Sequence, residues 1–247
     1  MCARGVIPRF SLFLCCMNVL SERKDNSRIT VDTLISEIKR LGKNPCCVGI
    51  DLTGSERRAS GMCVLRGWNA SLSLAHTDEE LIRIVETADA SLVSIDSSLG
   101  LPAGRCCVED SCECRKYGIM RDCERILRKR GIRVYPTLIK SMQQLTVRGI
   151  RLAKVFREQG YEVIESYPGG TQDLMNIPRK KTEPALLKSG LSAMGFILYS
   201  DRDSINHDEI DALTSALVGY FYLSGWYEAV GNAREGFLIL PDLSACP

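Results

Sequence analysis

The chain has 247 residues, a formal net charge of +2, and hydrophobic and charged fractions of 45% and 25%. This composition is typical of a globular protein and excludes a disordered one, and the length suits one large α/β domain or a domain with insertions. Residues 1–45 contain eight Lys/Arg and four Asp/Glu, a balance of +4, so residues 46–247 sum to −2. An overall basic charge for nucleic-acid binding is therefore excluded, and such binding would need local basic patches.

The twelve cysteines are too sparse at this length for a disulfide scaffold, and several occur as adjacent pairs that do not easily bridge. We therefore predict a reducing, cytoplasmic location. Arg4 and Arg9 precede an apolar stretch at residues 10–20, as in a signal peptide, but no small-residue cleavage pattern follows and the stretch is too short to cross a bilayer. We interpret it as an extension that packs on the body, or as sequence upstream of a start at Met17, and we expect no membrane partner.

The first elements predicted are a leader helix and a three-strand meander. Apolar residues recur at helical spacing over residues 30–41, with Thr30 as a plausible N-cap and Gly42 as a stop. Three short apolar runs then follow, separated by turn residues, as an antiparallel meander requires. These runs are residues 46–52, 59–66 and 70–76.

Helices and strands alternate after the meander. Thr77 and Glu80 form a capping box that predicts a helix over residues 78–88. The alternation predicts parallel strands joined by crossover helices. The remaining elements expected are a strand at 91–95, a helix near 120–130, a strand at 132–135, a helix near 142–159, a strand at 161–166, a short helix near 184–189, a strand at 196–199, an amphipathic helix at 208–223 and a hairpin-like tail at 228–240.

Four acidic residues occupy the ends of these predicted elements. Asp51 and Asp96 each follow an apolar strand, and Asp208 and Asp211 share a face at the start of the last long helix. Carboxylates that converge from two strand ends and one helix would bind hard divalent cations, which support phosphoryl transfer. Simpler interpretations are a turn aspartate at 51, a capping role at 96, and a favourable helix-dipole interaction for the helix acids.

Four segments resemble a known family. They are residues 49–53, 94–102, 163–168 and 207–213; the first three contain one acid each and the last contains three. They resemble the predicted nucleases of the family called domain of unknown function 429, over residues 46 to about 240. The resemblance implies a ribonuclease H-like mixed sheet, in which an antiparallel three-strand meander precedes parallel strands with crossover helices, and a nuclease activity. The last segment also resembles a helix of Holliday-junction resolvases, which implies a branched-DNA or repair-like substrate.

We therefore expect a ribonuclease H-like domain over residues 46–247, after an N-terminal extension with the leader helix at 1–45. Its expected function is metal-dependent hydrolysis of phosphodiester bonds in DNA or RNA by a two-metal carboxylate mechanism with Mg²⁺ or Mn²⁺. Asp51 would bridge both ions, and Asp96 and either Asp208 or Asp211 would each hold one. The alternative is a non-catalytic nucleic-acid-binding or scaffold protein with the same fold.

Two further residues lie near the predicted site. Glu165 also ends a strand and would reach the same edge as a catalytic group, although the loop expected at residues 168–170 favours a structural or substrate-loop role equally. His207 adjoins the helix acids and would be placed to shuttle a proton, but a histidine at a helix start is more often a partly exposed cap residue.

A cysteine-rich loop insertion at residues 103–123 is the second chemical feature. Thiolates at such short spacing bind Zn²⁺ or an iron–sulfur cluster, whereas the simpler interpretation is a set of small apolar residues. The charged neighbours of Cys112 and Cys114 favour a structural metal. The loop contains Cys106, and the four expected ligands are Cys107, Cys112, Cys114 and Cys123.

Basic residues follow directly. Arg121, Arg125 and Arg128 fall on one face of a helix beginning at Met120 and are candidates for contacting a nucleic-acid phosphate backbone, although solvated helix surface explains such runs as well. Residues 179–181 form a second, weaker patch. No oligomeric state is predicted.

Overall fold

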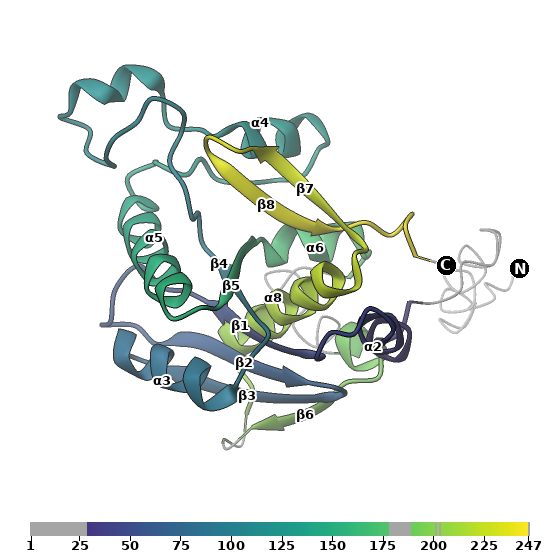
Figure 1. The fold of residues 1–247 in the computed structure, drawn as a ribbon. Helices are drawn as coiled ribbons and strands as arrows, with labels where there is room; N and C mark the ends of the chain where they lie inside the picture. The colour runs from purple at the N-terminus through teal and green to yellow at the C-terminus, as the bar shows by residue number, and fades with distance from the viewer. Residues whose placement is uncertain (1–28, 178–188, 201, 203, 247) are drawn as a thin grey trace, which may run out of the picture.

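The structure is a computed structural model that describes residues 29–177, 189–200, 202 and 204–246. Its strands form one eight-stranded mixed sheet in the order β6-β3-β2-β1-β4-β5-β8-β7 (Figure 1). The predicted α/β class is therefore confirmed. The strands are β1 (Cys46–Asp51), β2 (Ser60–Arg66), β3 (Asn69–Ala75), β4 (Leu92–Asp96), β5 (Glu162–Ser166), β6 (Ile197–Ser200), β7 (Tyr227–Asn232) and β8 (Gly236–Pro241).

The meander pairs antiparallel as predicted, β1 with β2 and β2 with β3, and β4 and β5 continue the sheet parallel to β1. The C-terminal tail is a β7–β8 hairpin whose second strand pairs parallel with β5. The helices are α2 (Val31–Arg40), α3 (Asp78–Ala88), the short 3₁₀ helix η1 (Glu113–Tyr117), α4 (Asp122–Lys129), α5 (Gln143–Glu158), α6 (Pro168–Leu174) and α8 (His207–Ser224).

Two local predictions are wrong. Residues 132–135 are not a strand but an irregular segment between α4 and α5. Ile132 packs beside Cys123 and Leu127 of α4, and Val134 is partly buried against the same cluster, so the aliphatic side chains of this run contact the preceding helix. Residues 168–170, expected as a loop, begin α6, because Pro168 occupies the first turn of a helix, where its missing N–H costs nothing.

Helices cover both faces of the sheet. On one face, Val48 and Ile50 of β1 pack with α3 and α5, and on the other face Cys47 packs with α2 and α8. Because side chains alternate along a strand, Gly49 and Asp51 point to the same side as Cys47. Figure 1 shows the helices on the two sides.

Helix α8 differs from the amphipathic helix predicted, because 15 of its 18 residues are buried. It lies on the sheet, and α2, α6 and β8 pack against it as well. Two glycines permit the close approach to the sheet. A Cβ at Gly49 would overlap the backbone of Ala212, and one at Gly61 would overlap the backbone of Asp208.

The local signals for the first two described helices are confirmed. The Thr30 side chain accepts a hydrogen bond from the backbone of Thr33, and the capping box of Thr77 and Glu80 is formed. Helix α2 packs its apolar side into the core beside α8. In the described part of the chain, no helix has the length and apolar character needed to cross a membrane. Predictions for residues 10–20, 179–181 and most of the helix near 184–189 fall outside the described residues.

Candidate functional site

Asp51 and Asp96 lie side by side at the carboxyl ends of two parallel strands. They are partners in the register that joins β1 to β4, and Asp51 also pairs with Gly61 of β2. Val93 and Ile95 face α3 and α5, so Asp96 points, like Asp51, to the face that α8 covers. The structure therefore brings the two predicted strand-end acids together on one face of the sheet.

A cavity of about 1000 Å³ opens at this edge. The carboxyl ends of β1, β4 and β5 border it, and α6, the start of α5 and the segment between α4 and α5 form its other walls. In open sheets with parallel strands, ligands bind outside the carboxyl ends of those strands. The acidic residues that line the cavity are Asp51, Asp96, Glu124, Glu165, Asp173 and Asp211.

The two helix acids are placed differently. Asp211 lines the cavity, is 6% exposed, and its Oδ1 accepts a hydrogen bond of 3.0 Å from Nε2 of Gln172 on α6. Asp208 does not line the cavity, although its backbone packs on Gly61. His207 is an exposed residue in the first turn of α8, where Asn206 is the N-cap. Of the two helix acids, Asp211 is thus the one that lines the cavity together with Asp51 and Asp96.

The carboxylates suit a hard divalent cation by their chemistry, because Mg²⁺ and Mn²⁺ prefer oxygen ligands. They do not form a closed cage in this conformation. Among the described residues, the one group of three or more His, Cys, Asp or Glu ligand atoms that all lie within 4.8 Å of one another consists of cysteines. The acids instead border the cavity at separate positions along its wall.

Glu165 has a structural partner that the sequence did not reveal. It is 4% exposed, and its Oε2 accepts a 2.8 Å hydrogen bond from Nη1 of Arg121 and one of 2.8 Å from the backbone N–H of Leu99. A second hydrogen bond joins Arg121 Nη2 to Glu165 Oε1. Glu165 therefore forms a bidentate ion pair with Arg121 in the cavity wall, where its charge is already balanced.

Arg121 is also wrongly predicted as a phosphate contact. It is 1% exposed, and Nε donates to Glu124 and Thr137, each at 3.0 Å. Burial disfavours the charge on Arg121, but the charge and hydrogen bond of Glu165, together with the charges of Cys123 and Glu124, outweigh it and raise the pKa of the guanidinium. A guanidinium paired in this way is not available to a nucleic acid.

The other two predicted arginines are on the surface. Arg125 is exposed and donates a 2.6 Å hydrogen bond to the carbonyl of Met120. Arg128 is exposed and, with Arg133, lines a hollow of about 310 Å³ that shares residues 131, 133 and 134 with the larger cavity. Tyr135, 64% exposed, borders the large cavity beside Arg133. Arg133 and Tyr135 were not predicted as site residues, because residues 132–135 were expected to form a strand.

Another buried arginine holds the turn that follows Asp51. Arg148 of α5 donates hydrogen bonds of 2.8 and 3.1 Å to the carbonyl and hydroxyl of Thr53, and one of 2.7 Å to Asp78 of α3. Burial lowers the pKa of Arg148, while the charge of Glu56 opposes that shift. Because Arg148 ties α3 and α5 to the turn after β1, it fixes the backbone next to Asp51.

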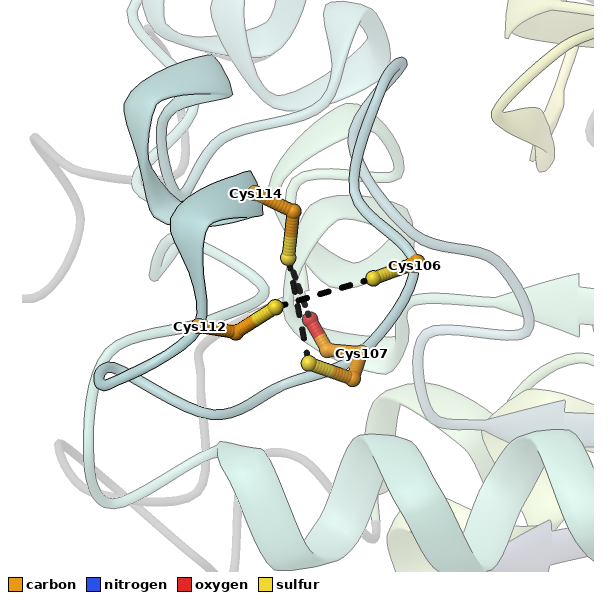
Figure 2. A group of neighbouring side chains, drawn as sticks. All are labelled: Cys106, Cys107, Cys112 and Cys114. Atoms are coloured by element: carbon orange, nitrogen blue, oxygen red, sulfur yellow. Dashed lines mark hydrogen bonds between the residues drawn. The ribbon is translucent and has the colours of Figure 1, made fainter.

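The cysteine loop contains a cluster of four thiols in the described structure. The Sγ atoms of Cys106 and Cys112 are 3.7 Å apart, and those of Cys107 and Cys114 are 3.8 Å apart. Figure 2 shows all four side chains pointing toward a common centre. Cys123, expected as a ligand, lies elsewhere. It is buried on α4 beside Leu127, where burial raises its pKa to about 12. Cys106 takes the place predicted for Cys123.

Hydrogen bonds within the cluster shift the pKa values of Cys106 and Cys114 in opposite directions. A backbone hydrogen bond from Cys106 is the largest influence that lowers the pKa of Cys114 to about 6. Hydrogen bonds with Cys114 and Cys112 raise the pKa of Cys106 to about 12. These shifts favour the thiolate form at Cys114 over that at Cys106.

Comparisons of the chain with protein-family models, with curated proteins and with solved structures found no match. The functional interpretation therefore depends on the geometry of the cavity and of the cysteine cluster.

Proposed function

We propose that the chain is a metal-dependent nuclease with a ribonuclease H-like fold, related to the domain of unknown function 429 family. The observation that carries the proposal is the pairing of Asp51 with Asp96 on neighbouring parallel strands, at the cavity that Asp211 also lines. Three carboxylates from separate elements at one opening are suited to binding divalent cations against a phosphate.

The strand order supports the fold assignment. The central five strands run β3-β2-β1-β4-β5, with an antiparallel meander followed by two strands parallel to β1. An antiparallel meander followed by parallel strands is what the sequence resemblance implies for a ribonuclease H-like sheet. Strands β6, β8 and β7 would then be additions at its two edges.

The proposed division of roles follows from position. Asp51 lies between Gly61 and Asp96 in the sheet register, and we assign to it the contact with both Mg²⁺ or Mn²⁺ ions. Asp96 and Asp211 would each contact one. When bound, such ions supply an activated water and stabilise the charge on the departing oxygen. Glu165 is a positioning residue in this proposal, because its ion pair with Arg121 secures the cavity wall.

Nucleic acid is the proposed substrate because of the side chains at the cavity mouth. Arg133 and Tyr135 are exposed there, and Arg128 lines the adjoining hollow. Arginine binds phosphate and tyrosine stacks on bases, so this rim is suited to a single-stranded or distorted segment. Free thiols throughout the described cysteines suit the reducing cytoplasm predicted from the sequence.

A non-catalytic nucleic-acid-binding protein is the second candidate. It is favoured by the open arrangement of the acids and by the Gln172 side chain, which already donates to Asp211. The two candidates differ in metal binding, which the cleaving enzyme needs and the scaffold does not.

The experiment combines cleavage with metal binding. Purified protein is incubated with end-labelled single-stranded, branched and hybrid nucleic acids in Mn²⁺ or Mg²⁺, and thermal unfolding is recorded with and without the ion. Asp51→Asn should reduce cleavage by about 10³-fold, equivalent to about 4 kcal/mol, and abolish the Mn²⁺-dependent rise in Tm. Glu158→Gln is the matched control, since this exposed acid on α5 lies outside the cavity and should leave both unchanged. Nucleic-acid binding with no Mn²⁺ effect on Tm and no cleavage would favour the scaffold.

A further inference from the structure

The segment between β4 and α4 projects from the body of the protein and has almost no apolar core (Figure 1). None of residues 103–118 belongs to the three hydrophobic clusters of the described structure. Its buried apolar side chains are only Val108 and Cys114. A segment that buries so little apolar surface does not offset the entropy lost on ordering, so another interaction must hold it.

The spacing of the sulfur atoms matches coordination of a single ion. Zn²⁺ binds thiolate sulfur at about 2.3 Å, and the edge of a tetrahedron with that radius is about 3.8 Å. The two measured Sγ–Sγ distances are 3.7 and 3.8 Å, and all four sulfurs lie within 4.8 Å of one another. Both pairs therefore already have the separation that a tetrahedral zinc site requires.

Other thiol chemistries fit these distances less well. A disulfide brings two sulfurs to about 2.05 Å, and both pairs are much farther apart than that. An iron–sulfur cluster places several iron and sulfide atoms between the cysteine sulfurs, so it holds them farther apart than one ion does. The four sulfur atoms lie within 4.8 Å of one another around a common centre, as a single ion requires (Figure 2).

Groups around the cluster support a negatively charged metal site. Arg105 is 7% exposed and donates hydrogen bonds to the carbonyls of Cys107 at 3.1 Å, Glu109 at 3.1 Å and Gly118 at 3.3 Å. These bonds join the start of the loop to the turn after Cys107 and to the C-cap of η1, the short helix that contains Cys114. Four thiolates around Zn²⁺ carry a net charge of −2, which the adjacent guanidinium of Arg105 partly balances.

We propose that Cys106, Cys107, Cys112 and Cys114 bind one Zn²⁺ ion as a tetrahedral thiolate site that folds residues 103–118. The site goes beyond the proposed nuclease function and does not depend on it. Its structural effect reaches the body of the protein through Glu235, which is buried and accepts hydrogen bonds from the backbone N–H groups of Ala103 at 2.7 Å and Asp122 at 2.5 Å, the two ends of the loop.

Metal content is the first test. Full-length protein is expressed with zinc and iron both supplied, and the metals are measured by elemental analysis. We expect about one zinc per chain in the wild type and less than about 0.1 in Cys106→Ser and in Cys112→Ser. Cys123→Ser and Cys246→Ser are matched controls outside the cluster and should keep about one zinc. Retention of zinc in both cluster variants, or its loss in Cys123→Ser with the fold intact, would overturn the assignment.

Cobalt substitution tests the geometry without any variant. Protein stripped of metal and titrated with Co²⁺ should develop the intense visible absorption of a tetrahedral thiolate site, saturating at one ion per chain. Limited proteolysis should cleave residues 103–118 faster in the stripped protein than in the zinc-loaded protein. Any of three results for the folded wild type would refute the proposal. The protein would contain no metal and take up no Co²⁺, or it would show an iron–sulfur absorption band, or thiol counting would show disulfides at these cysteines.

Discussion

Replacing Arg121 by methionine tests whether the cavity wall depends on a buried ion pair. The guanidinium donates to six acceptors, which belong to Glu124, Thr137, Glu165, Ser98 and the carbonyl of Glu235. Methionine fills much of the same volume but donates no hydrogen bond. The substitution therefore leaves Glu165, 4% exposed, without its counter-ion.

The magnitude follows from that uncompensated charge. Removing one partner of a buried ion pair costs about 3–5 kcal/mol. For a chain of this length, each kcal/mol lowers Tm by about 2–4 °C, so Arg121→Met should lower it by roughly 6–20 °C. Glu165→Gln in the same chain should recover about 2 kcal/mol or more, because a neutral amide is less costly to bury than an unpaired carboxylate.

Urea and thermal unfolding of the two single variants and the double variant would measure the coupling free energy directly. Arg125→Met is the control one turn away, where the side chain is exposed and the cost should stay within about 0.5 kcal/mol. The reasoning is refuted if Arg121→Met destabilises no more than Arg125→Met does, or if Glu165→Gln gives no recovery. Either result would show that the ion pair does not stabilise the cavity wall.

Two further predictions concern the core. Gly49→Ala should lower the free energy of unfolding in urea by about 3 kcal/mol or more, since its Cβ would overlap the backbone of α8. Gly54→Ala is the control: its Cβ would meet its nearest neighbour at 3.4 Å, so it should change that free energy by less than about 1 kcal/mol. Equal effects would contradict the close packing of β1 and α8. Burial raises the pKa of Cys47 and Cys63, so iodoacetamide should leave both unmodified in the native protein from pH 7 to 9, while labelling of the guanidinium-unfolded chain rises about tenfold per pH unit below the thiol pKa. Mass spectrometry of the labelled peptides gives the result, and rapid native labelling would show that these strands are accessible.

The sequence identified the features that depend on neighbouring residues. The capping box of Thr77 and Glu80 predicted the start of α3, and the apolar runs with intervening turns predicted the antiparallel meander. The C-terminal hairpin was predicted in the same way. These succeed because helix caps, side-chain alternation and turns are short-range interactions, which the order of residues nearly specifies.

Predictions that required long-range partners were less complete. Asp51 and Asp96 were correctly expected to be neighbours, because parallel strands align their carboxyl ends. The choice between Asp208 and Asp211 depended on how α8 packs on Gly49 and Gly61, which periodicity does not reveal. Likewise, nothing in the local sequence distinguishes Arg121 from the exposed arginines that follow it. Its ion-pair partner, Glu165, lies 44 residues farther along the chain.

What the sequence determined by itself was therefore the α/β class, most of the element boundaries and the chemical types available at each strand end. Tertiary structure alone decided which side chains meet. In the tertiary structure, Cys106 rather than Cys123 belongs to the cysteine cluster, and α8 is buried on nearly every side. Arg121 and Glu165, predicted as separate site residues, form an ion pair. The physical reason is that local patterns fix backbone geometry, whereas the burial and charge partners of a side chain depend on elements that the chain brings together from far along its length.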